Sequence, residues 1–424
     1  IYTRNTDTIV YYPTIYILFA FWNIPLALLG KNNITYDSTL CLFWSKGLGI
    51  VFLLFAHIFV YKISMLLFND KKKAFNSIFT LATFPIFFMF SFPWALYDTV
   101  WLSFLLGGIY FSMRNTKRDF IYMLVFFAIS VSVKTFVLFV IFPVLFFKVK
   151  NIIKLIFSAI CVMSIYVLET VIYRNSEYFV NNVISPLNGG FLINSLFGIS
   201  FGGISLLLVI FVCICLYNYQ NENNNFNLIF SIYVISSMFP CISRQTPNWH
   251  VIYIPFFAIL TGNLNKRERN FFSLLALAIS LGIFAYIMAT RGCYFSETSL
   301  GAGIFGKTIF GSMPVSDLYQ SQKTFFSLKL FGIPSEAQSF ASKANKIMNY
   351  ANSLTFACVL FSILWFRSRL NVTPPPETLV QDESNSGDFL YFQNRLYAYL
   401  CLFFILVLYT VPIFLWTLRY KGII

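Results

Sequence analysis

Ionisable side chains at the ends of apolar segments are the residues of this chain best suited to chemistry. Asp98 begins one apolar segment, in PWALYDTV, and Lys134 separates two short ones, in SVSVKT. Charge at the edge of hydrocarbon is costly and is commonly retained for function. Asp98 can bind a sugar hydroxyl or a metal, or it can cap a helix. Lys134 can hold the phosphate or diphosphate of a lipid, or it can extend to the interface as an anchor.

A short turn, FPCISRQTPNWHVIYIPF, supplies the second group of candidates. The guanidinium of Arg244 has the forked donor geometry that suits phosphate, and His250 can donate to the same phosphate or transfer a proton. Aromatic side chains accompany both groups of candidates. We expect Trp94, Tyr97 and Trp249 to contact substrate, although aromatic side chains and Arg also occur as anchors at a membrane interface.

The composition predicts a helical membrane protein. Of the 424 residues, 58% are hydrophobic and 11% are charged, whereas an ordinary soluble domain has about 25% charged residues. Apolar runs of about 17–20 residues recur, and helices of that length cross a hydrocarbon core of roughly 30 Å. The runs are continuous, which disfavours a barrel of alternating strands. The net charge of +14 falls in short loops between the runs, a pattern typical of membrane topology rather than of nucleic-acid binding.

These runs predict an all-α polytopic protein with about 12 transmembrane helices, at residues 47–68, 76–92, 97–113, 119–133, 135–148, 152–172, 202–219, 226–241, 248–263, 271–290, 351–367 and 397–417. If the spans alternate from an outer start, the clustered basic residues of the short loops fall inside: Lys71, Lys72, Lys73, Arg114, Lys117, Arg118, Lys148, Lys150, Lys154, Lys266, Arg267, Arg269, Arg367 and Arg369. Cytoplasmic loops retain basic residues, so this pattern predicts the orientation. The candidate residues then lie at the outer ends of their helices.

Four regions follow from this topology. Residues 1–46 form an outer N-terminal segment, residues 47–290 the transmembrane core, residues 291–350 an outer loop, and residues 351–424 the C-terminal helices. Within the last region, residues 371–390 are acidic and rich in Pro, so we expect a disordered inner connector. The apolar stretch that begins at YYP, rich in Tyr and Trp, is expected to lie in the interface as a helix, with a full span as the alternative. The first residue is Ile rather than Met, and we expect the natural N-terminus to be missing.

Four stretches carry a resemblance to a known family: YYPTIYILFAFWNIPL, ALYDTVWLSFLLGGIYF, SVSVKTFVLFVIFPVL and TPNWHVIYIPFFAIL. Together they cover roughly residues 8–262. Their order and predicted sidedness resemble bacterial members, of unassigned specificity, of the GT-C superfamily of polytopic glycosyltransferases. The resemblance implies inverting transfer of a sugar from a polyprenyl-phosphate donor to a glycan, lipid or protein acceptor. The reaction would take place on the non-cytoplasmic face of a bacterial plasma membrane.

The resemblance also implies roles for the candidate residues. The donor phosphate would be held by Lys134, Arg244 and His250. The substrate would contact Asp98, Trp94, Tyr97 and Trp249, with Asp98 alternatively a structural contact. The family usually carries its catalytic carboxylate in the first outer loop, a region here reduced to residues 1–9, where Asp7 is the one acidic residue. Either Asp7 is the base or the base lies in the missing segment. No Cys or His spacing predicts a metal site or another cofactor, and a divalent cation is left open.

Other functions stay open on the sequence alone. A polysaccharide polymerase or ligase would also have about a dozen spans and a long outer loop such as residues 291–350. A flippase or transporter of lipid-linked saccharides would have ionisable residues near the bilayer midplane and an internal repeat. No repeat is visible here, and most charges lie at helix ends. The flippase and a structural membrane scaffold are the two non-catalytic alternatives. All of these have the lipid bilayer as a partner and none requires nucleic acid.

Overall fold

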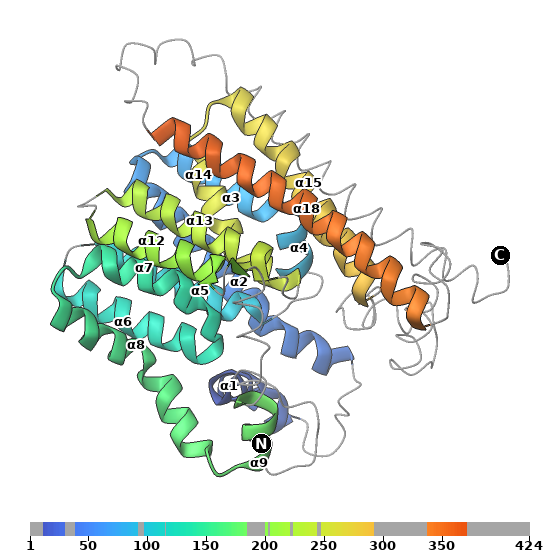
Figure 1. Ribbon diagram of the computed structural model, residues 1–424. Coiled ribbons are helices and arrows are strands. Elements are labelled where there is room, and N and C mark those ends of the chain that lie inside the picture. The colour runs from blue at the N-terminus through green and yellow to red at the C-terminus, as the bar shows by residue number, and fades with distance from the viewer. Residues whose placement is uncertain are drawn as a thin grey trace. The chain divides into compact units, whose positions relative to one another are not determined.

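A computed structural model of the chain describes residues 12–29, 39–91, 97–114, 116–184, 200–201, 204–220, 224–243, 247–291 and 337–370. The described part is almost entirely helical (Figure 1). Its first helices are α1 (Pro13–Leu29), α2 (Thr39–Phe68), α3 (Lys71–Thr83), α4 (Pro85–Ser91), α5 (Asp98–Met113), α6 (Lys117–Val133), the 3-10 turn η1 (Thr135–Val137), α7 (Leu138–Lys148) and α8 (Ile152–Tyr173). The predicted helical class is thus confirmed.

The second half continues with short elements and then long helices. These are α9 (Glu177–Phe179), the π-helical turn η2 (Val180–Ile184), strands β1 (Ser200–Phe201) and β2 (Ile204–Ser205), α12 (Leu206–Gln220), α13 (Asn225–Ser243), the 3-10 turn η3 (Pro247–Ile252), α14 (Ile254–Gly262), α15 (Lys266–Arg291) and α18 (Ala337–Leu370). The two strands pair antiparallel, with Ser200 opposite Ser205. They form a short hairpin directly before α12.

Several of the described helices suit a membrane by length and composition. Four are long and apolar enough to cross one: Trp44–Phe68, Ile152–Tyr173, Asn225–Ile242 and Asn349–Ser368. The pair α3 and α4, bent by 68°, passes the same test when taken together and would make a fifth. Three more apolar helices are shorter: Pro13–Leu28, Thr135–Lys148 and Leu206–Gln220. The chain therefore has several helices that can serve as membrane spans.

Prolines interrupt two of the predicted spans. The span at 76–92 is divided at Phe84, because Pro85 disfavours helical backbone in the residue before it. The span at 248–263 begins instead as the turn η3 and becomes α-helical only at Ile254. Pro255 follows directly, and its missing N–H and bulky ring oppose continuation of a helix from the preceding turn. The predicted span at 397–417 lies outside the described residues.

The last described helix is longer than expected. Helix α18 runs from Ala337 to Leu370 without a break. It therefore joins the end of the predicted outer loop, residues 291–350, to the predicted span at 351–367. Residues 371–390 lie outside the described part of the chain.

The chain divides into two compact units. The first consists of Ile1–Ile34, Gly47–Ile78 and Tyr97–Leu260, and the second of Thr35–Lys46, Phe79–Leu96 and Thr261–Ile424. In the second unit α15 packs along α18 and also contacts α4. A Cβ atom at Gly282 would lie 2.5 Å from the Thr355 hydroxyl oxygen and 3.1 Å from the Ala351 carbonyl oxygen. Any larger residue at this position would require Thr355 and the facing backbone of α18 to shift.

In the first unit, α5 packs on α6, α6 on α8, and α7 on α12 and α13. A Cβ atom at Gly107 or Gly108 would lie 2.3 Å from the ring of Phe126 or Phe127, respectively. The two glycines therefore let the rings of α6 lie directly against the backbone of α5. Ser130 adds a buried hydrogen bond between the same helices, from its hydroxyl to the Trp101 carbonyl oxygen at 2.9 Å.

Candidate functional site

The two charged candidates of the first group form an ion pair. Asp98 is the first residue of α5, and its Oδ1 lies 3.2 Å from Nζ of Lys134, which directly follows α6. The side chains are 3% and 13% exposed, respectively. A helix N-terminus favours a carboxylate and a helix C-terminus favours a cation, so both helix ends stabilise the pair. Asp98 is not a side-chain cap, because the capping position belongs to Tyr97.

Two further donors hold the Asp98 carboxylate. The indole N–H of Trp101 donates to Oδ1 at 2.7 Å, and the side-chain amide of Asn248 donates to Oδ2 at 2.9 Å. Asn248 belongs to η3, which brings a distant part of the chain to the start of α5. A buried charge is tolerated only when it is paired and hydrogen-bonded. Three donors from three elements meet this requirement for Asp98.

Aromatic rings surround the ion pair. Nζ of Lys134 lies 4.9 Å from the centroid of the Tyr97 ring and 5.6 Å from that of Phe136, distances at which a ring face attracts a cation. Phe136 stacks on Trp249 with centroids 4.5 Å apart, and Trp249 stacks on Phe239 at 5.2 Å. These rings exclude water from the pair and thereby strengthen its electrostatic attraction.

The structure brings four of the sequence candidates together: Asp98, Tyr97, Lys134 and Trp249. His250 follows on the same turn, 5% exposed, with its ring edge against Tyr253 at 5.7 Å between centroids. Its Nδ1 has no hydrogen-bond partner within the described residues. The remaining candidates, Asp7, Trp94 and Arg244, lie outside the described part of the chain.

Three residues of the site were not predicted. Trp101 lies three residues after Asp98, a spacing that places both side chains on one helix face, so this contact could have been found. Asn248 stands beside Trp249 in TPNWH, but nothing in the sequence says that a turn so far along the chain reaches α5. Phe136 is one of many Phe residues in apolar segments and carries no distinguishing signal.

The geometry favours a supporting role for Asp98. An ionised carboxylate has about four acceptor sites, and here three donors already occupy the oxygens. A general base needs a free site within reach of the proton that it removes. About one acceptor site is left, so the Asp98 carboxylate is largely satisfied by the protein, and its contact with Lys134 holds that ammonium in place. Within the residues that the structure describes, no three His, Cys, Asp or Glu side chains gather in a way that could hold a metal ion.

The opposite ends of the same helices carry the basic residues. Nζ of Lys148, at the end of α7, donates to the Arg114 carbonyl oxygen at 2.8 Å, just beyond α5. Nζ of Lys150 donates to the carbonyl oxygen of Asn218 at 2.9 Å, near the end of α12. Arg114 pairs with Asp119 at 3.3 Å, and a hydrogen bond to the Tyr110 hydroxyl raises the pKa of Arg114. These contacts confirm that α5, α6 and α7 run in alternate directions.

Two ends can thus be distinguished in the first unit. The ion-pair end holds Asp98, Lys134, Asn248 and Trp249, and the basic end holds Arg114, Lys148, Lys150 and Lys154. Comparison with protein-family models, with curated proteins and with solved structures finds no match to this chain.

Proposed function

We propose that this chain is a membrane glycosyltransferase of the GT-C type. It would move a sugar, with inversion, from a polyprenyl-phosphate donor to a glycan, lipid or protein acceptor. We further propose about 12 spans with an interfacial N-terminal helix, a bacterial plasma membrane, and a working face on the non-cytoplasmic side, where the ion-pair end would lie.

The observation that carries the proposal is the buried Asp98–Lys134 pair with its aromatic surroundings. A departing lipid phosphate needs a cation held in place before the reaction begins. Lys134 can provide this cation by exchanging Asp98 for the phosphate, since both are anions. Trp101 and Asn248 would keep the carboxylate hydrogen-bonded during the exchange. Arg244, near the same turn in sequence, is the second proposed phosphate ligand. Tyr97 would supply a ring face for a sugar, and Trp249, which is stacked on Phe136 and Phe239, would support the site from behind.

A lipid-linked saccharide flippase is the second candidate, and broken helices favour it. Transporters often build their sites from interrupted helices. Here α3 and α4 meet at a 68° bend, and 3-10 turns precede both α7 and α14. A buried ion pair beside such a break, at Lys134, also suits an ion-coupled transporter. Transfer chemistry and lipid movement must therefore be measured separately.

The test is transfer of radiolabelled sugar from a panel of polyprenyl-phosphate donors, using the full-length protein in membrane vesicles. Arg244→Ala removes one proposed phosphate ligand. For Lys134, the double variant Asp98→Asn/Lys134→Gln removes the cation without leaving a buried carboxylate unpaired. Arg174→Ala is the matched control, because Arg174 is an exposed cation outside the site that is predicted to lie on the same side.

We expect transfer from one donor class, with more than tenfold loss in Arg244→Ala and in the double variant and no loss in Arg174→Ala. That threshold corresponds to about 1.4 kcal/mol of transition-state stabilisation. Folded protein that transfers no sugar from any donor would contradict the proposal. Donor flipping without transfer would select the transporter instead.

A further inference from the structure

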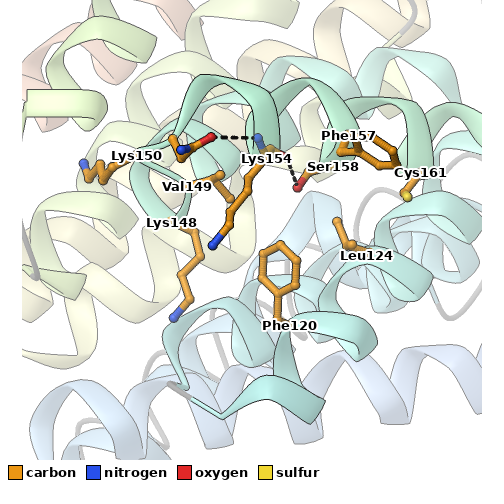
Figure 2. A pocket seen from close by; sticks show the side chains of 10 residues that line it. Phe120, Leu124, Lys148, Val149, Lys150, Lys154, Phe157, Ser158 and Cys161 are labelled. Carbon is orange, nitrogen blue, oxygen red and sulfur yellow. Dashed lines mark hydrogen bonds between the residues drawn. The ribbon is translucent and has the colours of Figure 1, made fainter.

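Helix α8 carries a charged residue near each of its ends, and the two residues differ in their access to water. At its start, which Asn151 caps, the exposed Lys154 lines a cavity of about 650 Å³. Figure 2 shows this cavity, with Phe120 of α6 among the side chains that line it. Near the other end of α8, Glu169 is only 6% exposed. A buried carboxyl in a helix apolar enough to cross a membrane is costly and commonly marks a functional site.

One oxygen of the Glu169 carboxylate contacts α1. The hydroxyl of Thr14, in the first turn of α1, donates to Oε1 at 2.5 Å. Tyr12, which directly precedes α1, packs on Tyr166 of α8 with ring centroids 4.8 Å apart and on Phe179 of α9 at 5.7 Å. Figure 1 shows α1 and α9 lying together at this end of α8. These contacts fasten α1 to α8.

The other oxygen of the carboxylate has no partner. Oε2 of Glu169 is buried and accepts no hydrogen bond from the residues that the structure describes. No described cation forms an ion pair with it: Arg174, the nearest basic residue in sequence, is exposed, and Lys134 pairs with Asp98. An ionised carboxylate that is removed from water without a counter-charge is costly. The carboxylate can therefore accept one positive charge that the described residues do not supply.

The neighbours of Glu169 indicate what kind of cation fits. The titratable side chains of the surrounding cluster are tyrosines of α1 and α8: Tyr12, Tyr16, Tyr166 and Tyr173. Helices α6 and α7, which also pack on α8, carry their charged residues at the basic end, and Glu177 of α9 is exposed. One carboxylate among neutral hydroxyl groups offers a single negative charge and oxygen ligands alone. This donor set suits a small monovalent cation better than a divalent or a thiolate-seeking metal.

We propose that Glu169 binds one small monovalent cation, a proton or Na⁺, at Oε2. The bound cation neutralises the buried carboxylate and thereby keeps α1 fastened to α8. Both cations supply the same unit charge, and acidic residues within membrane helices serve in proton and ion pathways. The site is separate from the ion-pair end and does not depend on sugar transfer.

The test is the folding equilibrium constant of the detergent-solubilised full-length protein, measured over a range of pH without Na⁺ and then at one alkaline pH with NaCl or choline chloride. We expect the constant to rise by up to about tenfold for each tenfold rise in the cation that binds, because that cation stabilises the folded state. A response to NaCl but not to choline chloride identifies a Na⁺ site. A response to falling pH alone identifies a proton site.

Glu169→Gln keeps an acceptor for Thr14 but has no charge to neutralise. It should lose the contribution of this cation, and it should be more stable than the wild-type chain at alkaline pH without Na⁺. Glu177→Gln is the matched control, because Glu177 is an exposed glutamate of α9, and it should respond to the cations as the wild-type chain does.

An equal response to the cations in Glu169→Gln would overturn the proposal. So would a wild-type folding constant that responds to neither cation. A Glu169→Gln chain that fails to fold would also overturn it, because the ionised carboxylate would then be required for the fold.

Discussion

The ion-pair end and the basic end are formed by the same helices, yet the charged side chains are buried at the first and largely solvent-accessible at the second. At the ion-pair end, Lys134 is 13% exposed and shares an almost fully buried carboxylate with two further donors. At the basic end, Arg114 is 43% exposed in its own ion pair. Lys148 and Lys150 there donate to backbone carbonyl oxygens. Lys154 forms no ion pair with a carboxylate in the described part of the chain.

The difference follows from burial. A charge removed from water must find its partners within the protein, whereas an exposed charge is stabilised by solvent and gains little from a partner. Substitutions at the ion-pair end should therefore change stability. Substitution of the exposed Lys154 at the basic end should leave stability nearly unchanged.

The largest effect is expected for Asp98→Asn, which leaves Lys134 buried without its counter-charge. Loss of one partner of a buried pair costs about 3–5 kcal/mol. The free energy of unfolding of the detergent-solubilised protein measures this loss. Asp98→Asn/Lys134→Gln should lose less than the sum of the two single variants, because neither charge is then left alone. Additive losses would mean that the pair does not stabilise the fold.

Asn248→Ala should have the next largest effect. It removes the amide that donates to Asp98 Oδ2, and a hydrogen bond to a charged group contributes about 1.5–3 kcal/mol. The same unfolding measurement reports the loss. Asn349→Ala, at an exposed position of α18, is the control and should change nothing. An unchanged free energy of unfolding in Asn248→Ala would show that the turn η3 does not support the ion pair.

Gly108→Ala tests the helix contact that keeps Asp98 and Lys134 side by side. The new Cβ would lie 2.3 Å from the buried Phe127 ring, and such overpacking costs about 1–3 kcal/mol. The thermal unfolding midpoint should fall accordingly. A smaller side chain in the double variant Gly108→Ala/Phe127→Leu should recover part of the loss. If it recovers nothing, the cost of Gly108→Ala comes from another contact.

Lys154→Gln should have the smallest effect on stability. Exposed positions without special contacts change the free energy of unfolding by no more than about 0.5 kcal/mol. The free energy of unfolding of the detergent-solubilised Lys154→Gln variant measures this effect. A loss as large as that of Asp98→Asn would mean that the basic end is also held by buried charge, and the contrast between the two ends would disappear.

Much of the fold could be predicted because it depends on local composition. Long apolar runs predict helices, and the distribution of Lys and Arg predicts their alternating direction, which the contacts of Lys148 and Lys150 confirm. Local hydrogen bonds are of the same kind: Nδ1 of His57 lies 2.8 Å from the Leu53 carbonyl oxygen one helical turn earlier. Each of these features needs only a few neighbouring residues.

Helix breaks were harder to predict. Pro85 divides one predicted span, whereas Pro143 and Pro240 lie inside α7 and α13. The residue type is the same in each case, so the sequence does not say which proline ends a helix. Tertiary packing determines whether a proline ends a helix, because neighbouring helices can compensate for the lost backbone hydrogen bond in one place and not in another.

The sequence by itself determined that this chain forms apolar helices, that Asp98 and Lys134 lie at one end of them, and that the basic loops lie at the other. Those properties come from transfer of side chains between water and an apolar medium, which each segment undergoes separately. Only the tertiary structure decided that Lys134 pairs with Asp98, that the Asn248 amide donates a hydrogen bond to the Asp98 carboxylate, and that Lys154 lies beside apolar side chains of α6 and α8. These contacts join residues far apart in the chain, and their existence depends on how whole helices pack.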